Sequence, residues 1–536
     1  MLHRWVSDGA AHDSDQHAPV CHPDTRKTII SDIMNWIEDP SRTSSVLWFN
    51  GPAGAGKTAI AQSLCKRCAA AQWLAGSFFF SRHAPGRSNA KSLFPTLAFE
   101  LSLVIPDVGK IINEVVANDP SIPTKDPEIQ LQKLILEPLQ QLSDQAMHHP
   151  VVIIIDGLDE CEGEDVQSNV LRLLGSVFQR SSVGCDRICL IVTSRPEPWI
   201  RDEFTVEPLF SITRQIFLGQ TSEANDDIRT FFRLGFTEIH DSPKHRLMMS
   251  NVAKPWPSYR VLDDLVDKAS GQFIYPDTVL KFVGDPNYRP TDRLDIITSI
   301  PMISPSALTS KPFGALDQLY SQILLTLPDK QRTLDILSAL ITMQQANSAL
   351  FLEWDPHVDV LRVAEKLLGL QPGDGPQALR MIHSLVHITG RSLISDVADD
   401  NLSRPEDLQT YYRNEDQIRF HHKSFTDYLL DPSRSLEYCV DMDEMNARLA
   451  LACIITMQTF SLQPTSRIAC GTFPLNFIYK LLILHAKFSY LGLCNALLDS
   501  SRHQVRNPAE NIDRSVDVLR PICMLLGHFG PRKNGV

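Results

Sequence analysis

A glycine-rich loop near the start of the chain has residue types and spacing suited to binding phosphate. Residues 51–58 read Gly-Pro-Ala-Gly-Ala-Gly-Lys-Thr and fit the pattern G-x-x-x-x-G-K-[ST] without a mismatch. Glycines let the backbone curl so that successive amides point at phosphate oxygens. Lys57 is expected to reach the β- and γ-phosphates, and the Thr58 hydroxyl to hold Mg²⁺. The predicted nucleotide contacts are Gly51, Pro52, Ala53, Gly54, Ala55, Gly56, Lys57, Thr58 and Ala59.

A group of acidic residues follows the apolar run at residues 151–155. Asp156 stands where the carboxyl end of a buried strand meets a ligand crevice, so it is expected to hold Mg²⁺, through water. Asp159 and Glu160 are candidates to orient or deprotonate an attacking water. A surface turn with incidental charge is the alternative. The glycine loop about one hundred residues upstream favours the metal site.

An arginine follows the next apolar run, at residues 188–192. Its guanidinium could contact a γ-phosphate with two hydrogen bonds and so respond to the presence of that phosphate. The competing interpretation is a solvated arginine in front of Pro196. We predict the phosphate-sensing role for Arg195.

The elements that must position these residues form an open, parallel α/β sheet. Strands are expected at residues 46–49, 76–80, 151–155, 188–192 and 214–218, and a helix at 59–70. Beyond about residue 220 the pattern becomes helical, with two short strands predicted at 392–395 and 417–420. The predicted organisation is a flexible leader (1–20), a P-loop NTPase domain (21–220), a helical domain (221–315), a winged-helix-like domain (316–432) and a helical region (433–536).

Composition excludes several classes of function. The net charge of −12 argues against binding to nucleic acid or to an anionic membrane surface. The predicted hairpin also carries acidic residues that would repel phosphates: Asp396, Asp399, Asp400, Glu406 and Asp407. The sequence contains no run of 18 apolar residues, so no membrane insertion is expected. Eleven scattered cysteines and a phosphate site together favour a reducing, cytoplasmic location.

These motifs resemble the NACHT domain of STAND-class P-loop NTPases, in the style common in filamentous fungi. The resemblance covers about residues 18–435, and its carrying segments are 21–26, 48–58, 156–161, 193–196, 269–275, 316–320 and 420–425. It implies a switch in which ADP holds a closed form, and ATP opens it and drives homo-oligomerisation for immunity-like or cell-death signalling. No effector domain is recognisable before residue 20 and no repeat array after 435, so the chain is expected either to be truncated or to rely on separate effector or sensor proteins as partners.

The resemblance also implies roles for residues outside the glycine loop. Thr25 and Arg26 lie where relatives approach the adenine of ATP or ADP. Phe273 replaces a proline that often contacts the adenine. His422 lies where a histidine reaches the β-phosphate of ADP, whereas Lys423 stands where many relatives carry aspartate.

Two other functions stay open at this stage. An actively hydrolysing ATPase or a kinase would use the same phosphate site, but the roughly 300 residues beyond the sheet exceed what a small kinase needs. A scaffold that has lost nucleotide binding is the third possibility, and intact Lys57, Thr58 and Asp156 argue against it.

Overall fold

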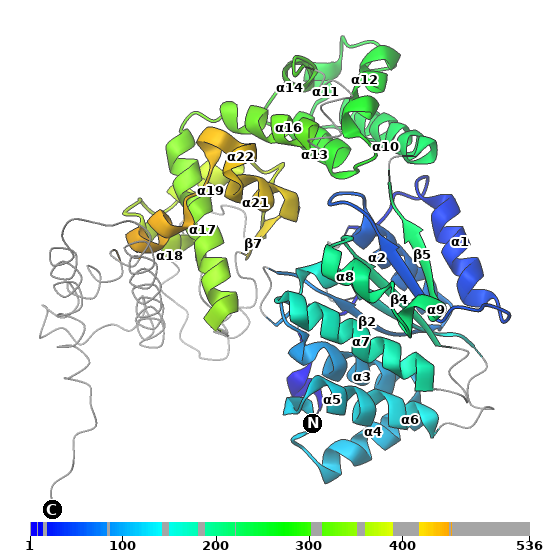
Figure 1. Ribbon diagram of the computed structural model, residues 1–536. Coiled ribbons are helices and arrows are strands. Elements are labelled where there is room, and N and C mark those ends of the chain that lie inside the picture. Colours follow the sequence, from blue (N-terminus) through cyan, green and yellow to red (C-terminus); the bar gives the residue numbers. More distant parts are fainter. Residues whose placement is uncertain are drawn as a thin grey trace, which may run out of the picture.

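A parallel sheet covered by helices forms the amino-terminal part of the molecule, and a set of helices follows it (Figure 1). The computed structural model describes residues 2–7, 9–13, 19–82, 86–141, 149–180, 188–219, 221–301, 313–350, 360–389, 417–449 and 452.

The sheet has five strands in the order β2-β3-β4-β1-β5, and every neighbouring pair is parallel. This confirms the predicted fold class. The strands are β1 (Val46–Asn50), β2 (Leu74–Phe79), β3 (Val151–Asp156), β4 (Ile188–Ser194) and β5 (Thr213–Phe217). Strand β4 lies between β1, which leads into the glycine loop, and β3, which ends at Asp156. Parallel pairing places all three carboxyl ends at one edge of the sheet.

Both faces of β1, β3 and β4 are buried, which explains the unbroken apolar runs of these strands. Leu47 and Phe49 of β1 pack in one core with helices α1 (Lys27–Glu38) and α2 (Lys57–Ala70). Val46 and Trp48 point to the opposite core, with α3 (Leu93–Val104) and α7 (Glu164–Arg180). The other helices of this part are α4 (Pro106–Asn118), α5 (Pro127–Leu131), α6 (Glu137–Gln140), α8 (Pro198–Glu203) and α9 (Leu209–Ile212).

One contiguous apolar core, from Ile228 to Leu449, joins the elements that follow the sheet. It therefore continues across the predicted domain boundary at residues 315 and 316. The helices of this part are α10 (Ser222–Asp241), α11 (Arg246–Met249), α12 (Tyr259–Ala269), α13 (Ile274–Val283), α14 (Pro290–Thr298), α16 (Gly314–Leu325), α17 (Lys330–Leu350), α18 (Val360–Leu367), α19 (Asp374–Arg380), α21 (Lys423–Leu430) and α22 (Pro432–Ser435). Strands β6 (Val386–Thr389) and β7 (Gln417–Phe420) form an antiparallel pair.

The predicted strand at 392–395, the acidic residues of the hairpin and, apart from Ala452, the predicted helical region beyond residue 449 lie outside the described residues. The partner of β7 is β6, at residues predicted to be helical. The described part of the leader is packed and not loose, because Leu2 and Ala10 are buried in the core and the Phe79 amide donates to the Ala10 carbonyl. Local composition missed these contacts because they join the leader to residues far along the chain.

None of the helices in the described ranges combines the length and the apolar character needed to cross a bilayer.

Candidate functional site

The glycine loop between β1 and α2 adopts the curled backbone that its glycines permit. Gly54 and Gly56 have φ angles of 77° and 91°, a region that side chains other than glycine rarely adopt. A Cβ atom on Gly54 would lie 2.2 Å from Cγ2 of Ile274, so space also requires glycine there. Within the described residues, no group accepts a hydrogen bond from the amides of Gly54, Gly56, Lys57 or Thr58. These donors at the start of α2 suit a phosphate.

Lys57 lies back across this loop. Its Nζ donates to the carbonyl oxygens of Gly51 at 2.8 Å and Pro52 at 2.9 Å. Burial lowers the pKa of Lys57 to about 8, and nearby Arg195 acts in the same direction, against the opposite effect of Asp159. An anion in the loop would relieve this cost of burying the ammonium group.

Asp156 ends β3 beside the start of α2. The Thr193 hydroxyl donates to Asp156 Oδ1 at 2.5 Å and accepts from the Gly157 amide at 3.0 Å. Burial raises the pKa of Asp156, against hydrogen bonds from the hydroxyls of Thr193 and Thr58 that favour the carboxylate. A carboxylate and a hydroxyl held together suit an octahedral cation that keeps several waters. The structure thus brings Asp156 and Thr58, the two predicted metal ligands, together.

Arg195 links the sheet edge to α21. Its amide donates to Asp159 Oδ1 at 3.0 Å and its Nε lies 3.3 Å from Asp159 Oδ2. The Nη2 atom of Arg195 donates to Oδ2 of Asp427, on α21, at 2.9 Å. Burial opposes the charged form, but Asp427 and Asp159 together raise the pKa of Arg195. The guanidinium is therefore held between two carboxylates that are 268 positions apart in the sequence, 427 minus 159.

A lysine from α21 also reaches the acidic residues. Lys423 Nζ lies 3.6 Å from Asp159 Oδ2. Burial opposes the ionisation of Asp159, but Lys423, Lys57 and Arg195 outweigh it and lower the pKa of this carboxyl. Glu160 accepts from the Arg82 amide at 3.3 Å, and burial raises its pKa. Asp159 is thus paired with cations, whereas burial favours the neutral form of Glu160.

His422 caps the start of α21. Its Nδ1 accepts from the Ser424 amide at 3.0 Å and lies 2.7 Å from the Ser424 hydroxyl. Burial lowers the pKa of His422 to about 3, with further contributions from Arg195 and Lys57. Because Nδ1 is an acceptor, the neutral ring carries its proton on Nε2. His422 can therefore offer one N–H donor beside the cations of the site.

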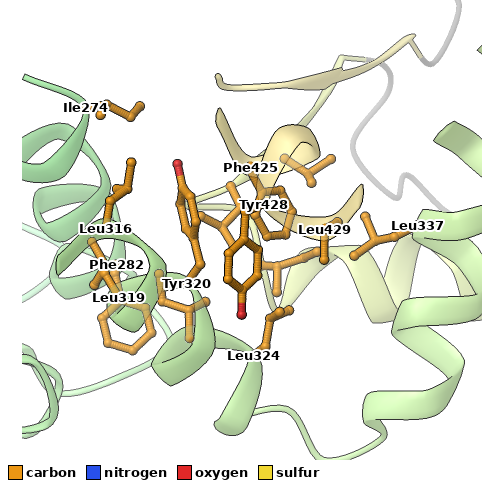
Figure 2. Close-up of a cluster of buried hydrophobic side chains, with 14 of the residues drawn as sticks. Ile274, Phe282, Leu316, Leu319, Tyr320, Leu324, Leu337, Phe425, Tyr428 and Leu429 are labelled. Atoms are coloured by element: carbon orange, nitrogen blue, oxygen red, sulfur yellow. The ribbon is translucent and has the colours of Figure 1, made fainter. Parts of the chain in front are cut away.

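Figure 2 shows how α21 is fixed to the helices behind it. Phe425 and Tyr428 surround Tyr320 of α16, with ring centroids 5.1 Å and 5.4 Å from it. The Tyr320 hydroxyl lies 2.7 Å from the hydroxyl of Ser424. The apolar face of α21 is thus buried in the core of the helical part, while His422, Lys423 and Asp427 lie at the sheet edge. Any movement of α21 must carry this core with it.

Thr25 and Arg26 lie on the other side of the loop. The Thr25 hydroxyl donates to the carbonyl of His22 at 3.1 Å, so it makes a local turn. Arg26 donates from its guanidinium to the Ala55 carbonyl at 3.1 Å and from its amide to Asp227 Oδ2 at 3.0 Å. The structure therefore brings Arg26, but no polar atom of Thr25, into contact with the glycine loop.

Helix α13 connects the two halves of the site. At its start, the Ile274 amide donates to the Gly54 carbonyl at 3.2 Å. Two turns later, Lys281 Nζ lies 3.2 Å from Nδ1 of His421, the residue before His422. Burial lowers the pKa of His421 to about 4, so the ring is a neutral acceptor for Lys281.

The family model described as Nephrocystin 3, N-terminal, matches residues 24–195, which are 172 of the 536 residues and contain the glycine loop, Asp156 and Arg195. This match supports a NACHT/STAND-type P-loop NTPase domain in this region. No protein among the curated sequences matches the chain significantly.

The solved structures that resemble this chain have low sequence identity to it. The structure of Drosophila ORC bound to DNA is 15% identical to this chain, with a TM-score of 0.32. The match covers 78% of this chain and 97% of the ORC chain. A STAND protein with a tetratricopeptide repeat sensor from Pyrococcus horikoshii is 13% identical, with a TM-score of 0.36. The match covers 94% of this chain and 59% of that protein. The Aeropyrum pernix ORC2 protein is 16% identical, with a TM-score of 0.30. The match covers 70% of this chain and 90% of that protein. These scores are too low to carry an argument, so the interpretation of this region depends on the family match over residues 24–195.

Sequence reasoning gave no role to several residues at the edge of the NTPase domain. Thr193 orients Asp156, Lys423 and Asp427 bring charge from α21, and Asp227 holds Arg26. The apolar spacing of α21 places residues 425, 428 and 429 in the core. That spacing could have identified 423 and 427 as neighbours on its polar face.

Proposed function

We propose that this protein is an ATP/ADP-binding signal-transduction switch of the NACHT/STAND class. The observation that carries the proposal is the position of Arg195, which contacts Asp159 at the phosphate site and Asp427 on α21. A γ-phosphate that attracts this guanidinium would compete with Asp427. The nucleotide state of the NTPase domain can therefore alter its contact with the helices that carry α21.

The nucleotide and its metal would be held by residues already described. The free amides of the glycine loop and Lys57 would bind the phosphates, and Thr58 and Asp156 would hold Mg²⁺. Bound Mg²⁺ supplies charge neutralisation for the phosphate oxygens. His422 would donate from Nε2 to a phosphate oxygen. Arg195 is proposed to respond to the γ-phosphate, and Asp159 and Glu160 to orient the water.

Slow hydrolysis fits this arrangement better than rapid turnover. Asp159 contacts Arg195 and Lys423, and its pKa is lowered, so it is a weak base. An active ATPase or a kinase remains the alternative. Rapid release of phosphate, or transfer to a small acceptor, would favour that alternative over the switch.

The biological setting is proposed from the resemblance to fungal NACHT proteins. We propose a cytoplasmic protein that forms a homo-oligomer with ATP and takes part in immunity-like or heterokaryon-incompatibility-type cell-death signalling. Separate effector or sensor proteins would be its partners.

Two measurements test the switch. The first identifies the nucleotide that co-purifies with the protein, and we expect ADP at close to one per chain. The second is size-exclusion chromatography with ADP and with a non-hydrolysable ATP analogue. We expect a compact monomer with ADP and a larger assembly with the analogue. A monomer of unchanged size in both conditions would contradict the proposal.

A further inference from the structure

Three side chains that are suited to binding a metal ion meet beside the edge strand β2. They are His12 and Asp13, from the leader, and Glu100, from α3. Each offers one ligand atom, and these atoms all lie within 4.8 Å of one another. Ligand atoms lie about 2.0–2.2 Å from a Zn²⁺ ion, so small side-chain rotations would bring one ring nitrogen and two carboxylate oxygens onto a common ion. Strands β3 and β4 separate β2 from β1 and its glycine loop, so this cluster is distinct from the nucleotide site.

The leader residue that carries the imidazole is held in place through its backbone. The His12 amide donates to the Ser77 hydroxyl, on β2, at 3.0 Å. The Gln62 side chain, which is 2% exposed on α2, donates to the His12 carbonyl. Two positions earlier, the Ala10 carbonyl accepts from the Phe79 amide at 2.9 Å. A metal site requires ligands in fixed positions, and these bonds fix the backbone of His12 before any ion binds.

Glu100 is oriented by the same serine of β2. Its Oε2 accepts from the Ser77 amide, and the Ser77 hydroxyl lies 3.4 Å from the same oxygen. Ser77 therefore contacts His12 and Glu100 at once. The hydrogen bonds that the described residues donate to this carboxylate all reach Oε2, which leaves Oε1 able to bind an ion. Partners that orient the ligands in this way are typical of metal sites.

The two carboxylates of the cluster lack a matching cation. Neither Asp13 nor Glu100 forms an ion pair with another residue in the described part of the chain. Burial, and then the charge of Asp13, raise the pKa of Glu100 to about 7. A divalent cation between the carboxylates would replace this repulsion by attraction. Burial lowers the pKa of His12, and Lys66 acts in the same direction, which favours the neutral ring that a metal ion requires.

We propose that His12, Asp13 and Glu100 form a Zn²⁺ site, with water completing the coordination of the ion. An imidazole ring together with carboxylates suits Zn²⁺, whereas Mg²⁺ prefers oxygen ligands and keeps several of its waters. Three protein ligands and one water are a common arrangement around Zn²⁺. The ion joins the leader to α3 and so fixes the leader against the edge strand of the sheet. Because an uncovered edge strand can pair with another chain, this structural role goes beyond the proposed nucleotide switch.

The test is a calorimetric titration of Zn²⁺ into the full chain after a chelator has removed bound metals. Excess Mg²⁺ is present to occupy the site predicted at Thr58 and Asp156. The parent protein should bind Zn²⁺, and His12→Ala and Glu100→Gln should each lower this affinity by at least about ten-fold to a hundred-fold, the loss typical of removing even an outer partner of a metal ligand. Zn²⁺ should raise the melting temperature of the parent but not that of Glu100→Gln.

His240→Ala is the matched control. His240 is also a partly buried histidine followed by an aspartate, but no third ligand joins this pair among the described residues. Its substitution should leave the Zn²⁺ affinity unchanged. The chain also has free cysteines that could bind Zn²⁺, so Co²⁺ is used to distinguish the two kinds of site. The first equivalent of Co²⁺ should show no thiolate charge-transfer absorption, because no cysteine belongs to the proposed site.

Several outcomes would overturn the proposal. They are a parent protein that binds no Zn²⁺, thiolate absorption at the first equivalent of Co²⁺, unchanged Zn²⁺ affinity in His12→Ala and Glu100→Gln, and an equal loss in His240→Ala. If a substitution at residue 12 or 100 prevents folding, Asp13→Asn, at an exposed position, provides the same measurement. ADP affinity should be unchanged in all of these variants, so the result does not depend on the proposed function.

Discussion

Removing the charge of Asp427 should loosen the contact between α21 and the phosphate site. Asp427→Asn keeps the size of the side chain but breaks its ion pair with Arg195. The side chains of Arg195 and Asp427 are 20% and 28% exposed, so the burial of this ion pair is intermediate between that of a core pair and that of a surface pair. Truncating a buried pair costs about 3–5 kcal/mol, and an exposed pair contributes about 0–1 kcal/mol.

The expected effect lies toward the lower end of this range because Arg195 keeps Asp159 as a partner. A loss of about 1–2 kcal/mol corresponds to a factor of about 5–30 in the equilibrium between the closed and open arrangements. If the closed arrangement retains ADP, the variant should release a fluorescent ADP analogue faster by a similar factor. Stopped-flow displacement by excess ADP measures this rate.

Asp317→Asn is the matched control for this experiment. Asp317 pairs with Arg434 at 2.7 Å, and these side chains are 17% and 18% exposed, but both belong to the helical part. The control should lower thermal stability and leave the rate of ADP release unchanged. Equal acceleration in both variants, or none in either, would refute the proposed role of the contact between Arg195 and Asp427.

Three other substitutions probe the site and its surroundings. Lys57→Met should abolish ADP binding in a calorimetric titration. It should also raise the melting temperature of the free protein at pH 7, because burial lowers the Lys57 pKa to about 8, and this gain should vanish as the pH rises from 8 to 10.5. Gly54→Ala should weaken ADP binding and cost at least about 1–2 kcal/mol in denaturant unfolding, since it combines a positive φ with a clash against Ile274. Glu100→Gln should be more stable than the parent above pH 7, because burial raises the Glu100 pKa to about 7. That difference should disappear as the pH falls towards 4.5, where both forms are neutral; a constant difference across this range would refute the pKa argument.

The sheet was predictable because its signals are local. The central strands β1, β3 and β4 begin as continuous apolar runs, and the carboxyl ends of parallel strands must meet at one edge. The neighbourhood of Thr58, Asp156 and Arg195 therefore follows from pattern and topology. The helix after the loop begins at Lys57, two residues before its predicted start.

The remaining contacts depend on how distant segments pack. Arg195 and Asp427 are 232 residues apart, and no local pattern specifies their pairing. The contact of Arg26 with Phe273 needs a rare backbone conformation that its residue type does not favour. The leader meets the edge strand β2 through a backbone hydrogen bond from the Phe79 amide to the Ala10 carbonyl, and such a bond leaves no signature in side-chain composition.

Helix α13 gives the glycine loop a mechanical route to the far side of the site. It begins on the Gly54 carbonyl, and Lys281 near its other end contacts His421. Ten helical residues span about 15 Å and behave as one stiff rod. A loop that tightens around phosphate would push or tilt this rod, and the rod would displace β7 together with the histidine that follows it. If the loop tightens in this way, α13 offers a second connection to the helical part, one that does not depend on Asp427.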